Sequence, residues 1–275
     1  MNNRLIKAVI VCVLISLAFS FIFPLFWMFL NSVRDTGDII MGNSISAGGK
    51  MSLRNYHDAL VEHNILRYLF NSFLVTGGTI ILTVFVSTML AFACARMQWA
   101  GSGSILFYVT LGLLIPPQIV LVPMFILVKN LHMVDNPFAL VLAVSAFNVS
   151  MTTIIAYGFL RTLPKEIEEA AMIDGCGIFR IFSTIILPVI QSAMAVMVIN
   201  IFLQSWNEFM FALVLISTDA YKTLPIGLLS YTGRYGTDYG GMFAAMSIAS
   251  LIPLSVFFIF NRQVERAVTA SSMLK

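Results

Sequence analysis

Four acidic side chains lie close together in a sequence that otherwise has long runs without charge. They are Glu166, Glu168, Glu169 and Asp174. Clustered carboxylates act as general acids and bases or as polar contacts to a partner. These crowd the start of a short predicted helix, where the helix dipole favours negative charge, and the apolar segments offer no nucleophile–base pair or second carboxylate. We therefore expect the acids to face a partner surface, and a membrane-bound enzyme has little support.

The helix that positions these acids is delimited by its flanking residues. Thr162 can cap its start with Pro164 in the first turn, and Gly175 and Gly177 end it. Residues recur at three- and four-residue spacing along one small, largely apolar face: Ile167, Ala170, Ala171 and Asp174. This face is one that a partner surface approaches closely. Shape alone favours the alternative, a capped loop helix without a partner.

The order of residues in 163–188 resembles a known motif. Glu169-Ala170-Ala171, three residues, Gly175, nine residues and then Ile185-Ile186-Leu187-Pro188 are similar to the EAA loop of permease subunits of ATP-binding-cassette importers. Cys176 stands where that family usually has alanine, a departure that leaves the docking residues intact. The resemblance implies a cytoplasmic coupling helix that docks in a cleft of a separate ATPase subunit.

The resemblance also implies roles for individual residues. Glu169 forms the polar contact with the ATPase, and Ala170 and Ala171 form the close-packed face. Asp174 belongs to the same motif, Gly175 makes the turn, and the pair Leu187 and Pro188 starts the fifth membrane span. Because the sequence lacks the phosphate-cradling pattern GxxxxGK[ST], we expect ATP and Mg²⁺ on the partner ATPase and no cofactor on this chain.

Composition identifies the class of protein. The 275 residues are 59% hydrophobic and only 11% charged, and the mean hydropathy is +0.92, so the chain is an integral membrane protein. The net charge of +3 comes without a basic run, and we predict no nucleic-acid surface. Cys12, Cys94 and Cys176 are scattered singly, a pattern that indicates neither a disulfide framework nor a metal site.

Uncharged runs long enough to cross a bilayer predict an all-α, polytopic fold with six transmembrane helices. They span 8–33, 68–95, 97–128, 136–160, 181–207 and 239–261. The first could pass for a signal peptide, but it is too long and lacks a cleavage site, so we interpret it as a retained span. The third is expected to start near Ile105 and to bend or unwind at Pro116, Pro117 and Pro123.

Charge places the termini and the Glu169 loop on the same side. Lys and Arg concentrate in the short segments that an even number of spans puts with the termini, which predicts that this side is cytoplasmic. The predicted organisation is a first span and external loop (1–65), a type I importer permease core with the loop at 163–188 (66–262) and a cytoplasmic tail (263–275). We expect the chain in a bacterial cytoplasmic (inner) membrane, surrounded by lipid.

Polar stripes run along two of the predicted spans. Ser145, Asn148 and Thr152 share one face of the fourth span. Asn200, Gln204 and Glu208 share a face of the fifth, which ends in Trp206-Asn207-Glu208-Phe209. Such groups are costly in a membrane unless they meet water, substrate or partners. A translocation lining that also includes Asn207 and hydrogen bonding between helices are equally good explanations.

The external segment before the last span is rich in tyrosine: Tyr221, Tyr231, Tyr235 and Tyr239. Trp206-Asn207-Glu208 followed by Thr223-Leu224-Pro225-Ile226-Gly227-Leu228 resembles the carbohydrate branch of the same family. The resemblance implies that these tyrosines contact a binding protein or a sugar, and anchoring at the membrane interface is the simpler alternative. In the first external loop, His57 and His63 are interpreted as solvated rather than as metal ligands.

These expectations converge on the permease subunit of an ATP-driven, binding-protein-dependent importer of a sugar or oligosaccharide. Its expected partners are a second, different permease (a homodimer is the alternative), two ATPase subunits and an extracytoplasmic solute-binding protein. The alternatives are a permease for a non-sugar solute such as a polyol phosphate, and a stand-alone secondary transporter. The latter needs intramembrane ionisable groups, and only Glu208, near the end of a span, approaches that requirement.

Overall fold

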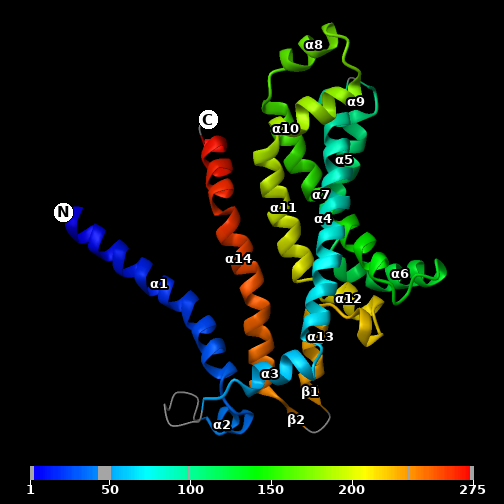
Figure 1. Ribbon diagram of the computed structural model, residues 1–275. Coiled ribbons are helices and arrows are strands. Elements are labelled where there is room, and N and C mark those ends of the chain that lie inside the picture. Colours follow the sequence, from blue (N-terminus) through cyan, green and yellow to red (C-terminus); the bar gives the residue numbers. More distant parts are fainter. Residues whose placement is uncertain (1–2, 43–50, 98, 234–235, 273–275) are drawn as a thin grey trace. The chain divides into compact units, whose positions relative to one another are not determined.

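The computed structural model spans residues 1–275 and describes 3–42, 51–97, 99–233 and 236–272. Side chains are described between residues 6 and 260 within those ranges. The chain forms two compact units, and Figure 1 labels their helices and strands. Unit 1 comprises Met1–Arg67 and Gly227–Ile252, and unit 2 comprises Tyr68–Ile226 and Pro253–Lys275.

Unit 1 holds short elements between the ends of two long apolar helices. Helix α1 (Asn3–Ser32) begins the unit, and the first part of α14 (Tyr239–Ser272) ends it. The short elements are α2 (Thr36–Ile40), α3 (Arg54–Val61), the 3₁₀ turn η4 (Leu228–Tyr231) and the strands β1 (Thr232–Gly233) and β2 (Gly236–Thr237). The two strands pair antiparallel, with Thr232 opposite Thr237.

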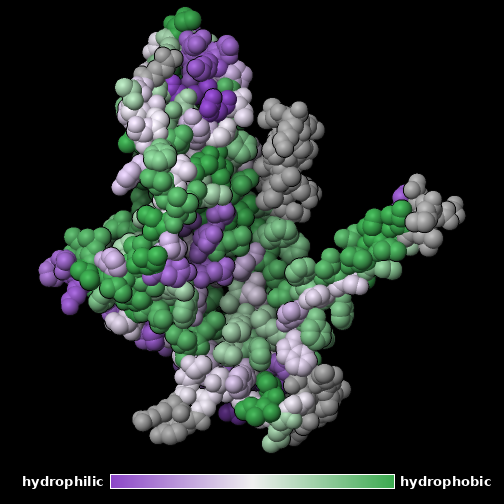
Figure 2. Space-filling model, turned by 180° about the vertical axis from the view of Figure 1, so that it is seen from behind, coloured by the Kyte–Doolittle hydropathy of each residue, from purple (hydrophilic) through white to green (hydrophobic). Residues whose placement is uncertain are grey.

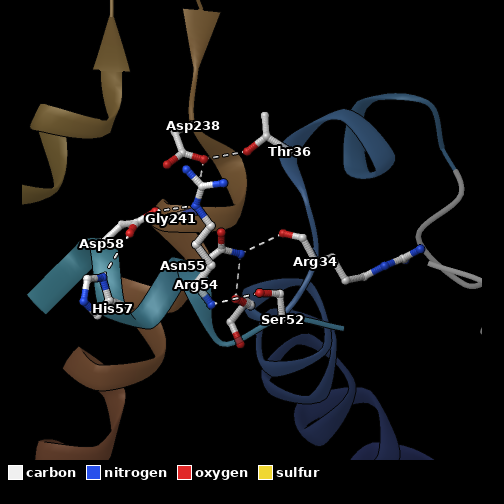
Figure 3. A network of polar contacts seen from close by, with 10 residues as sticks. Arg34, Thr36, Ser52, Arg54, Asn55, His57, Asp58, Asp238 and Gly241 are labelled. Carbon is white, nitrogen blue, oxygen red and sulfur yellow. Dashed lines mark hydrogen bonds and ion pairs between the residues drawn. The ribbon is translucent and has the colours of Figure 1, made fainter. Parts of the chain in front are cut away.

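A polar network fastens the short elements of unit 1 to one another (Figure 3). The Asn55 amide in α3 donates to the backbone carbonyls of Ser32 and Arg34, at 2.9 and 2.7 Å. Thr36 Oγ1 donates to the Asp238 carboxylate, which also accepts from the N–H of Gly241 at 3.1 Å. Segments far apart in the sequence are thereby joined by hydrogen bonds that satisfy otherwise unpaired backbone groups.

Unit 2 contains the remaining helices. In chain order they are α4 (Ile65–Arg96), α5 (Ser102–Leu111), η1 (Gly112–Leu114), α6 (Pro117–Asn130), α7 (Pro137–Thr162), α8 (Glu166–Ile173), α9 (Ile178–Arg180), the π-helix η2 (Ile181–Ile186), α10 (Leu187–Val189), α11 (Gln191–Trp206), α12 (Met210–Leu215), η3 (Asp219–Tyr221) and α13 (Leu224–Gly227). The first residues of α4 belong to unit 1, and α14 continues from unit 1 into unit 2.

Within the described ranges, four helices are long and apolar enough to cross a membrane, and two bent helix pairs raise the number to six if each pair counts as one span. The predicted break in the third span is confirmed at Pro116, where α5 with η1 and α6 meet at 104°, whereas Pro123 lies inside α6 and does not break it. Helix α5 begins at Ser102, slightly before the predicted Ile105.

The fifth span differs from its prediction. Residues 178–189 lie at 79° to α11 instead of continuing it, because Ile190 leaves helical geometry between the two. The straight part of the span therefore starts at Gln191. Leu187 and Pro188, predicted to start the span, lie in α10 before the bend.

Two apolar clusters form the core of unit 2. One joins α4, α7 and α12 through residues such as Val75, Leu140 and Phe211. The other joins α4, α7, η2 and α11 around Leu160 and Ile181, and it also includes Ala171 of α8. Buried hydroxyl residues run along the side of α4 at helical spacing: Ser72, Thr76, Thr79, Thr83 and Ser87. Small polar residues of this kind let membrane helices pack closely.

Candidate functional site

Helix α8 has two faces of different character. Glu168 and Ala171, three residues apart, are buried, whereas Glu166, Glu169, Ala170 and Ile173 are exposed. These four exposed residues share one helical stripe, Ile167 and Met172 are exposed as well, and Ile173 is 86% exposed. Figure 2 shows hydrophilic residues gathered at the α8 end of unit 2, in contrast to the largely hydrophobic surface of its spans. The acids predicted as one group are thus divided between the two faces.

The inward face carries a buried ion pair. Arg96, the last residue of α4, places its Nε 2.9 Å from Glu168 Oε1, and the two side chains are only 3% and 8% exposed. Arg96 Nη2 donates to the backbone carbonyl of Leu163 at 2.9 Å. Burial raises the pKa of the Glu168 carboxyl above its ordinary value, and the charges of Arg96 and Lys165 oppose that rise. One guanidinium group therefore contacts α8 and Leu163, the residue that follows α7.

The burial of Ala171 differs from one predicted contact. Ala171, assigned with Ala170 to the face that meets a partner, is 6% exposed and packs into the core of unit 2. Ala170 remains exposed, as do Glu169 and Asp174. Met172 and Ile173, which the sequence reasoning did not single out, are exposed beside them. From the exposed residues we group Glu169, Ala170, Ile173 and Asp174, which we call the outward face of α8.

The ends of α8 are only partly as predicted. Gly175 has φ +80, so it makes the predicted turn in a conformation that glycine adopts without strain. Thr162, predicted as the cap, is instead the last residue of α7, and its hydroxyl donates to the Phe159 carbonyl. Lys165 occupies the N-cap position without a side-chain hydrogen bond.

A polar cavity of about 400 Å³ lies among η1, α7, α11 and α12 in unit 2. Its polar wall contains Asn148 from α7, Asn200 and Gln204 from α11, and Glu208, which follows α11. Its apolar wall includes Phe147 and Phe211, whose ring centroids lie 5.2 Å apart. The volume is within the range of small-molecule sites. Four residues of the two predicted stripes therefore meet around one space.

Hydrogen bonds within unit 2 fix parts of this wall. Asn148 Nδ2 donates to the Val144 carbonyl at 2.9 Å, one turn earlier in α7. Glu208 Oε1 accepts from the N–H of Phe211 at 2.7 Å, in the manner of a helix N-cap for α12. Gly112 lies so close to α7 that a Cβ placed on it would collide with Ser150 Oγ. The absence of a side chain at Gly112 thus lets η1 approach α7 beside the cavity.

Three residues of the predicted lining lie outside the cavity wall. Ser145 and Thr152 are buried in α7, at 3% and 2% exposure, and they are placed for packing between helices. Asn207 donates from Nδ2 to the Leu203 carbonyl at 2.8 Å. Neither Asn207, which bonds within its own helix, nor Ser145, whose Oγ has no hydrogen-bond partner among the described residues, supports hydrogen bonding between helices, so both explanations of the stripes stay predictions.

The predicted tyrosine contacts also differ from one another. Tyr221 and Tyr239 are exposed. Tyr231 is 2% exposed, and its ring centroid lies 4.3 Å from that of His63, so it supports the fold of unit 1 and presents no ring to a docked protein. Tyr235 lies outside the described residues. The His57 ring lies 3.3 Å from Asp58.

Comparisons with known proteins agree with this geometry. The family model described as "Binding-protein-dependent transport system inner membrane component" matches residues 84–270. The diacetylchitobiose uptake system permease protein NgcG of Streptomyces coelicolor is 31% identical over 98% of this chain and 89% of its own length. The arabinooligosaccharides transport system permease protein AraQ of Bacillus subtilis is 29% identical over 89% of this chain and 87% of its own.

A solved structure shares the fold. It is a bacterial ABC transporter involved in the import of the acidic polysaccharide alginate. The TM-score is 0.79 at 17% sequence identity, and the match covers 95% of this chain and 96% of the other. The all-α fold predicted from the charge gaps is thereby confirmed as that of an importer permease.

Proposed function

This chain belongs to the family of binding-protein-dependent transport system inner membrane components, and from that premise we propose that it couples a separate ATPase to the import of a sugar or oligosaccharide. The cavity of unit 2 is the observation that carries the substrate class. Its amides and carboxylate donate to and accept from hydroxyl groups, and its aromatic wall offers apolar surface to a sugar ring. The permeases NgcG and AraQ support the same class, since both are named for oligosaccharides.

The outward face of α8 supports the part of the proposal that concerns ATP. An exposed carboxylate beside a small residue and an exposed isoleucine suits a protein interface better than it suits solvent. Glu169 forms the polar contact with the ATPase, and Ala170 allows close approach. Exposed Ile173, in place of buried Ala171, supplies apolar area to this contact.

Transport then proceeds by alternating access. Nucleotide binding closes two ATPase subunits, and α8 moves with the ATPase cleft in which it docks. The spans then open the cavity to the outside, where a docked binding protein releases the sugar. Asn148, Asn200 and Gln204 hold the solute by hydrogen bonds that replace those to water. A second, different permease completes the pathway, and both termini and α8 face the cytoplasm of a bacterium.

Reconstitution tests the proposal. The chain is co-expressed with its partner permease, ATPase and binding protein, and ATP-dependent uptake into vesicles is measured for glucose, N,N′-diacetylchitobiose, arabino-oligosaccharides and a polyol phosphate. We expect saturable, ATP-dependent uptake of at least one sugar. Uptake of the polyol phosphate alone, or sugar uptake that continues without hydrolysed nucleotide, would refute the proposal.

A further inference from the structure

The buried pair of Arg96 and Glu168 joins segments that are distant in the sequence. The chain already connects α8 to α7 on one side and to α9 on the other. Helix α4 is not its neighbour in sequence, and Arg96 at the end of α4 supplies the ionic contact, 2.9 Å from Glu168. The same guanidinium holds the Leu163 carbonyl. A displacement of α8 therefore acts on a third helix through one side chain.

The surroundings of the pair argue for a purpose beyond stability. Both charges lie beside an apolar cluster that includes Phe92, Leu160 and Ala171. Burying two charges carries a large desolvation cost, and well-packed apolar residues usually stabilise such a site as well or better. What the arginine adds is one charged group that makes an ion pair with Glu168 and a hydrogen bond to the Leu163 carbonyl, two contacts that apolar side chains cannot supply.

Contacts lead from α4 towards the cavity. Ser87 Oγ in α4 donates to the Val149 carbonyl of α7 at 3.3 Å, next to Asn148 in the cavity wall. Further along, Gly78 lies against Val141, because a Cβ on the glycine would come within 3.1 Å of the valine methyl group. Helix α4 thus packs along the helix that carries Asn148.

We propose that Arg96 and Glu168 are positioning residues that lock α8 to α4, so that movement of the outward face of α8 is transmitted to the helices around the cavity. The proposal rests on the proposed function, since it presumes that an ATPase moves α8. It gives Glu168 a role different from that of its neighbour Glu169. Glu169 meets the partner, whereas Glu168 holds α8 to its own chain.

The test compares hydrolysis with transport in the complete, reconstituted importer. Arg96→Gln and Glu168→Gln each neutralise one member of the pair and leave the charge of the other buried and unpaired. Each is expected to lower the solute imported per ATP hydrolysed about tenfold while the ATPase stays bound. Exchanging the charges (Arg96→Glu with Glu168→Arg) is expected to restore much of the lost ratio. Arg96→Lys should give an intermediate ratio of solute imported to ATP hydrolysed, because a single ammonium nitrogen cannot contact Glu168 and Leu163 from separate nitrogens as the guanidinium does.

Arg161→Gln is the matched control. Arg161 also lies in the last turn of a span, but it is exposed and rests over the Tyr157 ring at 5.8 Å. Its replacement should leave the ratio unchanged. An unchanged ratio in both single variants would overturn the proposal, and so would a charge exchange that performs no better than either single variant. If the single variants fail to assemble with the ATPase, recovery of assembly and of the ratio by the exchange supports the proposal, and failure of the exchange overturns it. Failure of the proposed function itself is distinguishable, because the unsubstituted complex would then show no ATP-dependent uptake.

Discussion

The α8 end of unit 2 and its polar cavity hold their polar groups in opposite ways. At α8, buried Glu168 is paired with an arginine from another helix, and its neighbour Glu169 is exposed. Around the cavity, the hydrogen bonds of Asn148 and Glu208 run to backbone close by in the sequence. The first arrangement ties separate helices together, and the second lines a space. Under the proposed function, the first region transmits movement and the second receives a solute.

The largest effect is expected when the exposed negative charge of Glu169 is reversed. Glu169→Lys should leave the chain folded and abolish ATPase association, because losing a buried interfacial charge contact costs about 2–5 kcal/mol. Detergent pull-down of the ATPase measures the effect. Glu62→Lys makes the same charge change at an exposed residue of unit 1 and should bind the ATPase normally. If the Glu169→Lys variant retained as much ATPase as the unsubstituted chain, the proposed docking of the ATPase on α8 would be wrong.

The packing beside the cavity offers a second contrast. Gly112→Ala places a methyl group on Ser150 Oγ, and we expect it to lower stability by about 1–2 kcal/mol and to reduce uptake. Thermal unfolding in detergent measures the change. Adding Ser150→Ala should recover most of it. Gly103→Ala, where a Cβ meets open space, should be neutral or slightly stabilising. Equal losses for the two glycines would show that close approach of η1 to α7 is unimportant.

Two glutamines of α11, one in the cavity wall and one outside it, test whether the cavity binds the sugar. Gln204→Ala removes a hydrogen-bonding group from the wall, so the half-saturating sugar concentration should rise about fivefold, equivalent to about 1 kcal/mol. Uptake of several sugars should also show a changed preference. Gln191→Ala, at the exposed start of α11 and outside the wall, should leave both unchanged. If Gln204→Ala behaved like Gln191→Ala, Gln204 would make no contact with the sugar.

The smallest expected effect concerns pH and tests the hydrogen bonds of Asp135, which join segments far apart in the sequence and lie outside the cavity. Slight burial raises the pKa of Asp135, but hydrogen bonds from Thr218 and Ser217 outweigh it and hold that pKa below its usual value. A depressed carboxyl pKa stabilises the fold above the unfolded pKa, and this contribution disappears as pH falls through the folded pKa. The unsubstituted protein should therefore exceed Asp135→Asn in melting temperature at neutral pH, and the gap should close in acid. A gap independent of pH would contradict this reading.

Spacing predicted much of both regions, and the misses share a physical cause. The stripe of Asn200, Gln204 and Glu208 was visible because apolar spans make polar residues conspicuous, and all three line the cavity. Ala171 was assigned outward because a short amphipathic helix does not show which of two small faces its own chain covers. The deciding residue, Arg96, lies on another helix, and its pairing with Glu168 is a tertiary contact without a local signal.

The break in the fifth span was missed for a related reason. Residues 181–207 are uniformly uncharged, so hydropathy could not distinguish one straight helix from two that meet at 79°. The bend in the third span was predicted correctly because Pro116 and Pro117 carry a local signal for it. Ser145 and Thr152 share the polar stripe of Asn148 but face neighbouring helices, because the cavity reaches only part of α7.

Adjacent alanines give the most direct measurement of the central claim, that an ATPase docks on one face of α8 while the other is held by the chain itself. Ala170→Cys and Ala171→Cys are each made after Cys12, Cys94 and Cys176 have been replaced, and a photoactivatable thiol crosslinker is attached in membranes that contain the complete importer. The account predicts that position 170 crosslinks to the ATPase and that position 171 does not. Crosslinking of the ATPase from position 171 in preference to position 170 would contradict it.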